Sequence, residues 1–112
     1  MDKARRKEIQ REFKEHVAPR GIFAVRCATG GRSWVSASRN LEKQQNQLWF
    51  GLRQGGLPNA ELQAAWNTHG EADFTFEVLE EVIDENPLLI DSLLKEREQH
   101  WRTKLGADKV YG

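Results

Sequence analysis

The sequence predicts a small α+β domain in which a three-stranded, mainly antiparallel sheet is flanked by helices, in the order α-β-β-α-α-β-α. Two apolar segments with a glycine turn between them, residues 21–28 and 33–38, indicate a β-hairpin. Segments with apolar residues at helical spacing precede and follow it. The length of 112 residues suits one domain. We therefore assign residues 1–18 to an N-terminal amphipathic helix packed on the domain, and residues 19–112 to the domain itself.

The segment over residues 3–16 is predicted to be helical because Ile9, Phe13 and Val17 recur at intervals of four positions. Pro19 disfavours a helical conformation at the residue before it, so the helix should end there. The apolar stripe is narrow and most neighbouring positions are charged, which is typical of a helix that lies on the surface of a domain. This helix is also our candidate for contact with a protein partner.

The hairpin is predicted to occupy the centre of the sheet. Its turn is Thr29-Gly30-Gly31-Arg32, in which the glycines are free to adopt positive φ. Side chains alternate between the two faces of a strand. The first strand therefore carries two sets, one with Phe23, Val25 and Cys27 and the other with Ile22, Ala24 and Arg26. Both sets contain apolar residues, so we expect the sheet to be covered on both faces.

Asparagine and glycine residues delimit the two helices that follow the hairpin. Asn40 is a suitable N-cap, and the apolar stripe after it ends before Gly55. Gln44 occupies a place in that stripe where a hydrophobic residue is expected. A second, shorter helix is predicted between Asn59 and Gly70, which is a typical C-terminal stop.

The C-terminal third is predicted to contain one strand and one long helix. Residues 74–80 alternate apolar and polar side chains, which indicates a strand with one exposed face. Asn86-Pro87 combines an N-cap with a proline suited to the first helical turn, and the helix should run to about Leu105. The tail over residues 108–112 is predicted to be short and irregular.

Composition constrains the partners and the location of the protein. The 17 Lys and Arg residues balance the 17 Asp and Glu residues, so no overall positive field indicates a nucleic-acid-binding protein. A mainly basic segment at 3–14 and an acidic one at 71–85 are either two solvated faces or a basic arm that contacts phosphate and an acidic ridge that faces away. The sequence has no apolar run long enough to span a membrane and no secretory signal, so we expect a cytoplasmic protein without membrane contact.

Cysteine, histidine and tryptophan give no local signature of a site. Cys27 is the single cysteine, so no intrachain disulfide can form, and we interpret it as a small buried hydrophobic residue. His16, His69 and His100 lack the spacing of metal ligands and are interpreted as surface or capping residues. The four tryptophans would stack on bases if they were exposed, but their spacing favours core packing.

Glu98 is the strongest single candidate for a functional residue. It lies on the same helical stripe as Leu94 and Trp101, where a carboxylate is costly unless it is paired or binds a cation. A hard divalent ion such as Mg²⁺ commonly uses one or two carboxylates together with waters and phosphate oxygens. The alternative is structural: Glu98 lies at the edge of the stripe, reaches solvent, or pairs with Arg26 or Arg39.

Two triplets, Gly21-Ile22-Phe23 and Trp34-Val35-Ser36, are separated by ten residues and followed by Glu98 on a helix. This arrangement resembles the GIY-YIG nuclease superfamily, and the resemblance covers roughly residues 20–111. It is most similar to a small bacterial branch grouped with LuxR-type regulators. Further matching features are Ser38-Arg39-Asn40-Leu41, Asn59-Ala60-Glu61-Leu62 and the strand that begins at Phe74.

The resemblance implies metal-dependent hydrolysis of phosphodiester bonds in DNA or RNA, with Mg²⁺ or Mn²⁺ held by Glu98. It also implies that Phe23, Trp34 and Gln44 stand at catalytic motif positions, where the family has two tyrosines and an arginine. Phenyl and indole groups cannot act as the general base proposed for one of those tyrosines. Arg26, Arg39 and Arg53 are candidates to supply the charge that Gln44 lacks, and Arg39 is assigned to the site.

Two further positions depart from the family pattern. Ser36 stands where glycine is usual, which makes close approach of a backbone less free. The family often closes with an asparagine, whereas this chain ends with Tyr111-Gly112. These departures predict that catalysis is weakened or lost.

Three functions therefore remain open from the sequence. The first is an endonuclease. The second is a protein that binds nucleic acid without cutting it, through a groove containing Arg26, Arg39 and Arg53. The third is a protein-interaction module that shares only the fold.

Overall fold

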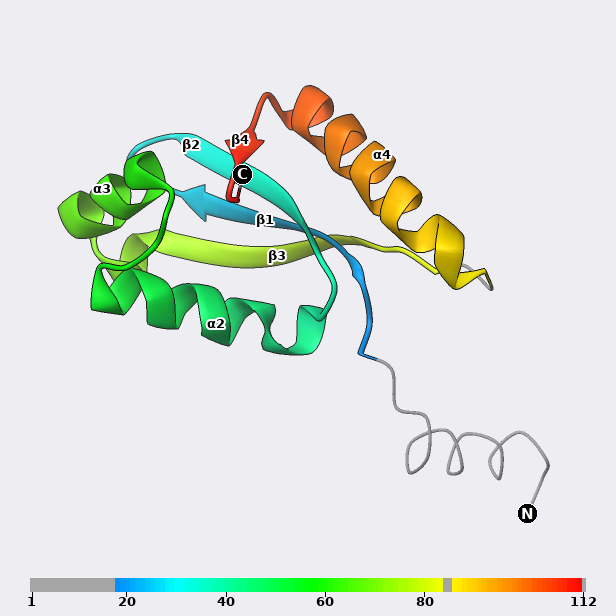
Figure 1. The fold of residues 1–112 in the computed structure, drawn as a ribbon. Helices are drawn as coiled ribbons and strands as arrows, with labels where there is room; N and C mark the ends of the chain where they lie inside the picture. Colours follow the sequence, from blue (N-terminus) through cyan, green and yellow to red (C-terminus); the bar gives the residue numbers. More distant parts are fainter. Residues whose placement is uncertain (1–17, 84–85, 112) are drawn as a thin grey trace, which may run out of the picture.

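The computed structural model describes residues 18–83 and 86–111 of the chain. In chain order the elements are β1 (Gly21–Cys27), β2 (Arg32–Ser38), α2 (Leu41–Gln54), α3 (Ala60–His69), the 3₁₀ helix η1 (Glu71–Asp73), β3 (Phe74–Glu81), α4 (Pro87–Leu105) and β4 (Asp108–Lys109). They form an α+β domain, as predicted, with helices on both faces of one sheet (Figure 1). The predicted helix over residues 3–16 lies outside the described residues, so its packing on the domain stays a prediction.

The sheet has four strands in the order β3-β1-β2-β4, where three were predicted. β1 is antiparallel to both β2 and β3, which confirms that the hairpin lies at the centre. β4 pairs in parallel with β2 through Trp34 with Asp108 and Val35 with Lys109. The predicted element order lacked this fourth strand, and the prediction of an irregular tail was wrong. Two residues are too few to show alternation, and their pairing depends on a strand distant in the sequence.

The three α-helices in the described residues begin after asparagine N-caps, of which Asn40 and Asn86 were predicted as caps and Asn59 was predicted to start its helix. Each cap side chain accepts a hydrogen bond from a backbone N–H of its helix: Asn40 from Lys43 at 3.2 Å, Asn59 from Leu62 at 3.1 Å and Asn86 from Leu88 at 3.0 Å. These bonds satisfy N–H groups that the first turn of a helix leaves without an intrahelical partner. None of the helices in the described part of the chain is long and apolar enough to cross a bilayer.

The two faces of the sheet carry separate apolar cores, as the alternation in the hairpin predicted. Phe23, Val25, Cys27 and Trp34 pack against α2 and α3 on one face. The opposite face packs against α4 through the residues Ile22, Ala24, Val35, Ile90 and Leu94. Figure 1 shows α4 on one side of the sheet and α2 on the other. Each functional position on β1 or β2 is therefore assigned to one face by its place in the strand.

The tryptophans pack in the interior. Trp34, Trp49 and Trp66 are buried in the core beneath α2 and α3. The rings of Trp49 and Trp66 meet edge to face with centroids 5.3 Å apart. Trp101 is half-buried and its indole N–H donates to Glu80 Oε1 at 2.8 Å. Core packing, rather than base stacking, is their observed role.

Gly21, the first residue of the first triplet, has a structural role. A Cβ atom at this position would lie 2.0 Å from the carbonyl oxygen of Glu80. The register between β1 and β3 shifts between Ile22 and Phe23, which brings the two backbones close together. Glycine is therefore required here by strand packing.

Candidate active site

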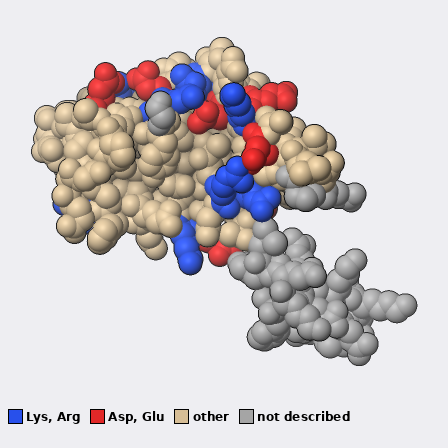
Figure 2. Space-filling model, viewed as in Figure 1, with Lys and Arg blue, Asp and Glu red and all other residues tan. Residues whose placement is uncertain are grey.

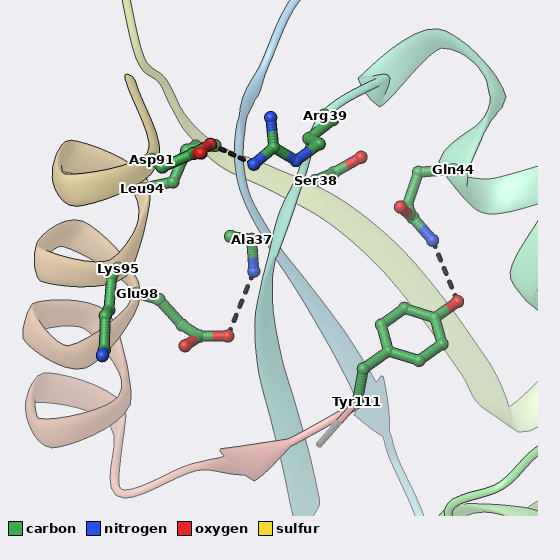
Figure 3. A pocket seen from close by; sticks show the side chains of 9 residues that line it. All are labelled: Ala37, Ser38, Arg39, Gln44, Asp91, Leu94, Lys95, Glu98 and Tyr111. Atoms are coloured by element: carbon green, nitrogen blue, oxygen red, sulfur yellow. Dashed lines mark hydrogen bonds and ion pairs between the residues drawn. The ribbon is translucent and has the colours of Figure 1, made fainter. Parts of the chain in front are cut away.

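A pocket of about 420 Å³ lies beside the C-terminal end of β2. Its walls come from β2, α4, the first turn of α2 and the C-terminal tail (Figure 3). The lining residues are Ala37, Ser38, Arg39, Gln44, Asp91, Leu94, Lys95, Glu98 and Tyr111. Three of the sequence-predicted site residues thus meet in one place: Glu98, Gln44 and Arg39.

Glu98 reaches from α4 to the edge of β2. Its Oε1 accepts a hydrogen bond from the backbone N–H of Ala37 at 3.2 Å. That N–H is available because β4 pairs only with Trp34 and Val35. Glu98 Oε2 lies 4.0 Å from Lys109 Nζ, and the side chain is 14% exposed. The carboxylate is thus oriented by the sheet and keeps lone pairs for a ligand in the pocket.

The sequence left open that Glu98 has a structural role and pairs with Arg26 or Arg39, and it pairs with neither. Arg39 forms an ion pair with Asp91, and Arg26 forms one with Glu77. Lys109 is the basic group nearest to Glu98, at a separation where an ion pair is weak. A partly buried carboxylate with so little neighbouring positive charge is a suitable binding site for a cation.

Tyr111 is a pocket residue whose role the sequence did not indicate. Its hydroxyl oxygen accepts a hydrogen bond from Gln44 Nε2 at 3.1 Å. Burial raises the pKa of Tyr111 above its ordinary value, and the hydrogen bond from Gln44 opposes that shift. The phenol is therefore protonated at neutral pH and can donate a hydrogen bond to a bound group. The signal in the sequence was that the chain ends with Tyr111-Gly112, whereas the family often closes with an asparagine.

Ser36 holds the tail that carries Tyr111. The Ser36 side chain is buried, and its Oγ accepts hydrogen bonds from Val110 N at 2.9 Å and Tyr111 N at 3.3 Å. Asn59 Nδ2 adds bonds to the carbonyl oxygens of Lys109 at 2.8 Å and Val110 at 3.2 Å. The serine that departs from the family pattern therefore anchors the tail, and the glutamine that departs from it contacts the same tyrosine.

Phe23 and Trp34 do not line this pocket. Both are fully buried on the face of the sheet that α2 and α3 cover. The Phe23 ring stacks on Phe76 with centroids 5.1 Å apart. Trp34 stacks on Phe74, and its indole N–H has no hydrogen-bond partner among the described residues. These positions contribute packing, and their assignment as altered catalytic positions stays a prediction.

The predicted binding arginines are dispersed. Arg53 forms a bidentate pair with Glu71 at 2.7 and 2.8 Å, which raises the pKa of Arg53 and lowers that of Glu71. Arg26 is paired with Glu77, and only Arg39 lines the pocket. Figure 2 shows basic and acidic side chains interspersed on the face in view, without one continuous basic patch. The nucleic-acid groove predicted from these three arginines stays a prediction.

The element order, the sheet and the position of Glu98 together define a GIY-YIG-like fold. The structure is similar to the catalytic domain of the intron endonuclease I-TevI, solved as a glutamate-to-alanine variant, with a TM-score of 0.68 and 24% identity over 84% of this chain and 99% of that chain. A second structure of the catalytic domain of the homing endonuclease I-TevI has a TM-score of 0.65 and 25% identity, over 78% of this chain and 88% of that chain. The predicted fold is thereby confirmed. No family model matches the sequence, and no curated protein does either.

Proposed function

We propose that this chain is a metal-dependent nuclease that binds the phosphodiester backbone of a nucleic acid in the pocket beside β2. The observation that carries the proposal is the pocket itself, which has the Glu98 carboxylate on one wall and the hydrogen-bonded pair of Tyr111 and Gln44 on another (Figure 3). Both structural neighbours are catalytic domains of endonucleases, which supports the same reaction class.

The donor set of the pocket fits a hard divalent ion. Glu98 offers one carboxylate whose Oε2 has only Lys109 nearby, at 4.0 Å, among the described residues. Mg²⁺ and Mn²⁺ favour carboxylate oxygen, and Mg²⁺ typically keeps several waters and phosphate oxygens in its coordination shell. When bound, such an ion makes a coordinated water more acidic and neutralises charge on the phosphate.

The other pocket residues position the phosphate. The Tyr111 hydroxyl accepts from Gln44 and so presents its proton to a phosphate oxygen. Lys95 adds a positive charge to the pocket, and it has no ion-pair partner among the residues that the structure describes. Neutral donors at Gln44 and Tyr111 stabilise developing negative charge less than an arginine would. We therefore expect slow cleavage.

A second candidate function is binding without cleavage. The lining of the pocket includes no histidine, and its one phenol is protonated at neutral pH. The pocket therefore offers neither an imidazole nor a phenolate, which are common general bases. This observation favours a domain that holds nucleic acid and does not cut it.

Cleavage of supercoiled plasmid and of labelled single-stranded DNA and RNA, with Mg²⁺ or Mn²⁺, tests the proposal. We expect the wild-type protein to cut slowly and Glu98→Gln to lose at least 100-fold in rate, on the order of the loss of one transition-state contact. Glu96→Gln is the matched control, because Glu96 is an exposed carboxylate on the same helix.

Equal background cutting by all three proteins would refute the hydrolytic proposal. Retained binding to the same nucleic acids in that case would support the second candidate. Binding that is also absent would leave the fold as a protein-interaction module.

A further inference from the structure

A second group of metal-ligating side chains lies at the other end of the β1–β2 hairpin, far from Glu98 in the fold. One potential ligand atom from each of Cys27, His69 and Asp73 lies within 4.8 Å of the others. Cys27 ends β1, His69 ends α3 and Asp73 ends η1, so three separate elements converge there. The sequence did not reveal this group because the cysteine and the histidine are distant along the chain.

The carboxylate of this group is already held in position. Asp73 Oδ2 accepts a hydrogen bond from Thr29 N at 3.0 Å, and Oδ1 accepts one from Thr29 Oγ1 at 2.8 Å. The backbone of the same turn is fixed by Ala28 N, which donates to the Asp73 carbonyl oxygen at 3.0 Å. Hydrogen bonds of this kind orient ligating carboxylates in metal sites.

The thiol and the carboxylate are in direct contact. Cys27 Sγ donates to Asp73 Oδ2 at 3.2 Å, and Cys27 is 2% exposed. A tetrahedral zinc ion with bonds of about 2.0–2.3 Å holds its ligand atoms about 3.3–3.8 Å apart. The sulfur and the oxygen are therefore close to that separation, and the imidazole nitrogen lies within 4.8 Å of both.

Gly30 leaves room beside the two other donors. A Cβ atom at this position would lie 3.2 Å from Cys27 Sγ and 3.4 Å from His69 Nε2. The backbone of the turn thus passes close to the sulfur and the nitrogen without a side chain to cover them. An alanine at this position would crowd both atoms.

We propose that Cys27, His69 and Asp73 bind one zinc ion, with a water as the fourth ligand. Thiolate and imidazole are ligands that zinc prefers, whereas Mg²⁺ is bound through oxygen. Binding forms a bond from zinc to the Cys27 sulfur and releases the thiol proton to solvent. The ion joins the end of the hairpin to the segment between α3 and β3. This proposal is independent of the proposed nuclease function.

Titration of the metal-free full-length protein with Co²⁺, followed by competition with Zn²⁺, tests the site. We expect one equivalent of Co²⁺ to produce the near-ultraviolet absorption of a cobalt–thiolate bond and the visible bands of tetrahedral cobalt. One equivalent of Zn²⁺ should abolish both. His69→Gln and Gly30→Ala should each weaken Co²⁺ binding at least tenfold, and Cys27→Ser should remove the thiolate band.

Two controls separate this site from the pocket. His100→Gln changes a histidine outside the group, and Glu98→Gln removes the candidate ligand for the hard ion. Both should develop the cobalt–thiolate band at the same Co²⁺ concentration as the wild type does, and circular dichroism confirms that each variant is folded. Absence of the thiolate band in the wild-type protein would overturn the proposal. Unchanged binding by folded His69→Gln, or loss of binding in Glu98→Gln, would overturn it as well.

Discussion

At the scale of single residues, Tyr111 connects two of the departures from the GIY-YIG motif. Its hydroxyl accepts from Gln44, which the resemblance aligns with the family's arginine, and its backbone N–H donates to Ser36, which the resemblance aligns with a glycine. Glu98 lies in the same pocket. Three of the altered positions, Ser36, Gln44 and Tyr111, therefore form one connected hydrogen-bonded group, whereas Phe23 and Trp34 lie in the core.

The pKa of Tyr111 can be measured directly, because the chain contains one tyrosine. We expect the near-ultraviolet absorbance of tyrosinate to develop above the ordinary value of about 10 in the folded protein, and at about 10 in urea. The folded-state pKa is raised, so the stabilisation is present below about pH 10 and is lost as the pH rises through the folded-state value. Gln44→Leu removes the opposing hydrogen bond and should move the titration higher. Equal values in the folded and unfolded states would contradict this account.

At the scale of elements, the decisive contact is between β2 and the tail that contains β4. Ser36→Ala removes the acceptor for two backbone N–H groups, and we expect a loss of about 1–3 kcal/mol in the free energy of unfolding. Hydrogen exchange at Val110 and Tyr111 should become faster because the tail opens more often.

Cleavage by the same variant should fall about tenfold because Tyr111 loses its position. A loss of about tenfold corresponds to the contribution of one neutral hydrogen bond.

Ser33→Ala is the matched control for that experiment, because Ser33 lies on the same strand and its side chain makes no hydrogen bond to the described residues. Urea denaturation and amide exchange should leave it close to the wild type. Equal destabilisation by both substitutions would show that the tail does not depend on the Ser36 hydroxyl.

At the scale of the whole molecule, charge balance limits how the domain would bind nucleic acid in the proposed function. The net charge is zero, and Arg26, Arg39 and Arg53 are each paired with an acidic residue. We infer that one to three phosphates are contacted at the pocket, which corresponds to a slope of about −1 to −3 in a plot of log K against log salt. Lys95→Ala should reduce the magnitude of that slope by about 0.9.

Fluorescence anisotropy at several salt concentrations measures this slope. Lys104→Ala is the control, since Lys104 lies over the Trp101 ring and does not line the pocket. A slope near −8, typical of a protein that neutralises about nine phosphates, would contradict the localised site.

The sequence by itself determined the local structure and the fold class. Neighbouring residues along the chain set three features: the alternation in β1, the caps Asn40, Asn59 and Asn86, and the helical stripe that carries Glu98. Their patterns can therefore be recognised in the sequence alone. The resemblance carried by the two triplets predicted the GIY-YIG-like fold that the structural comparison confirmed.

Only the tertiary structure decided which side chains meet. β4 is too short to show a periodic pattern, so the sequence could not indicate that the tail pairs with β2 and brings Tyr111 to Gln44. Cys27 and Asp73 meet because β1 and β3 are neighbouring strands, although they are distant along the chain. Periodicity reports the environment of one element, whereas a site depends on the register and packing of several.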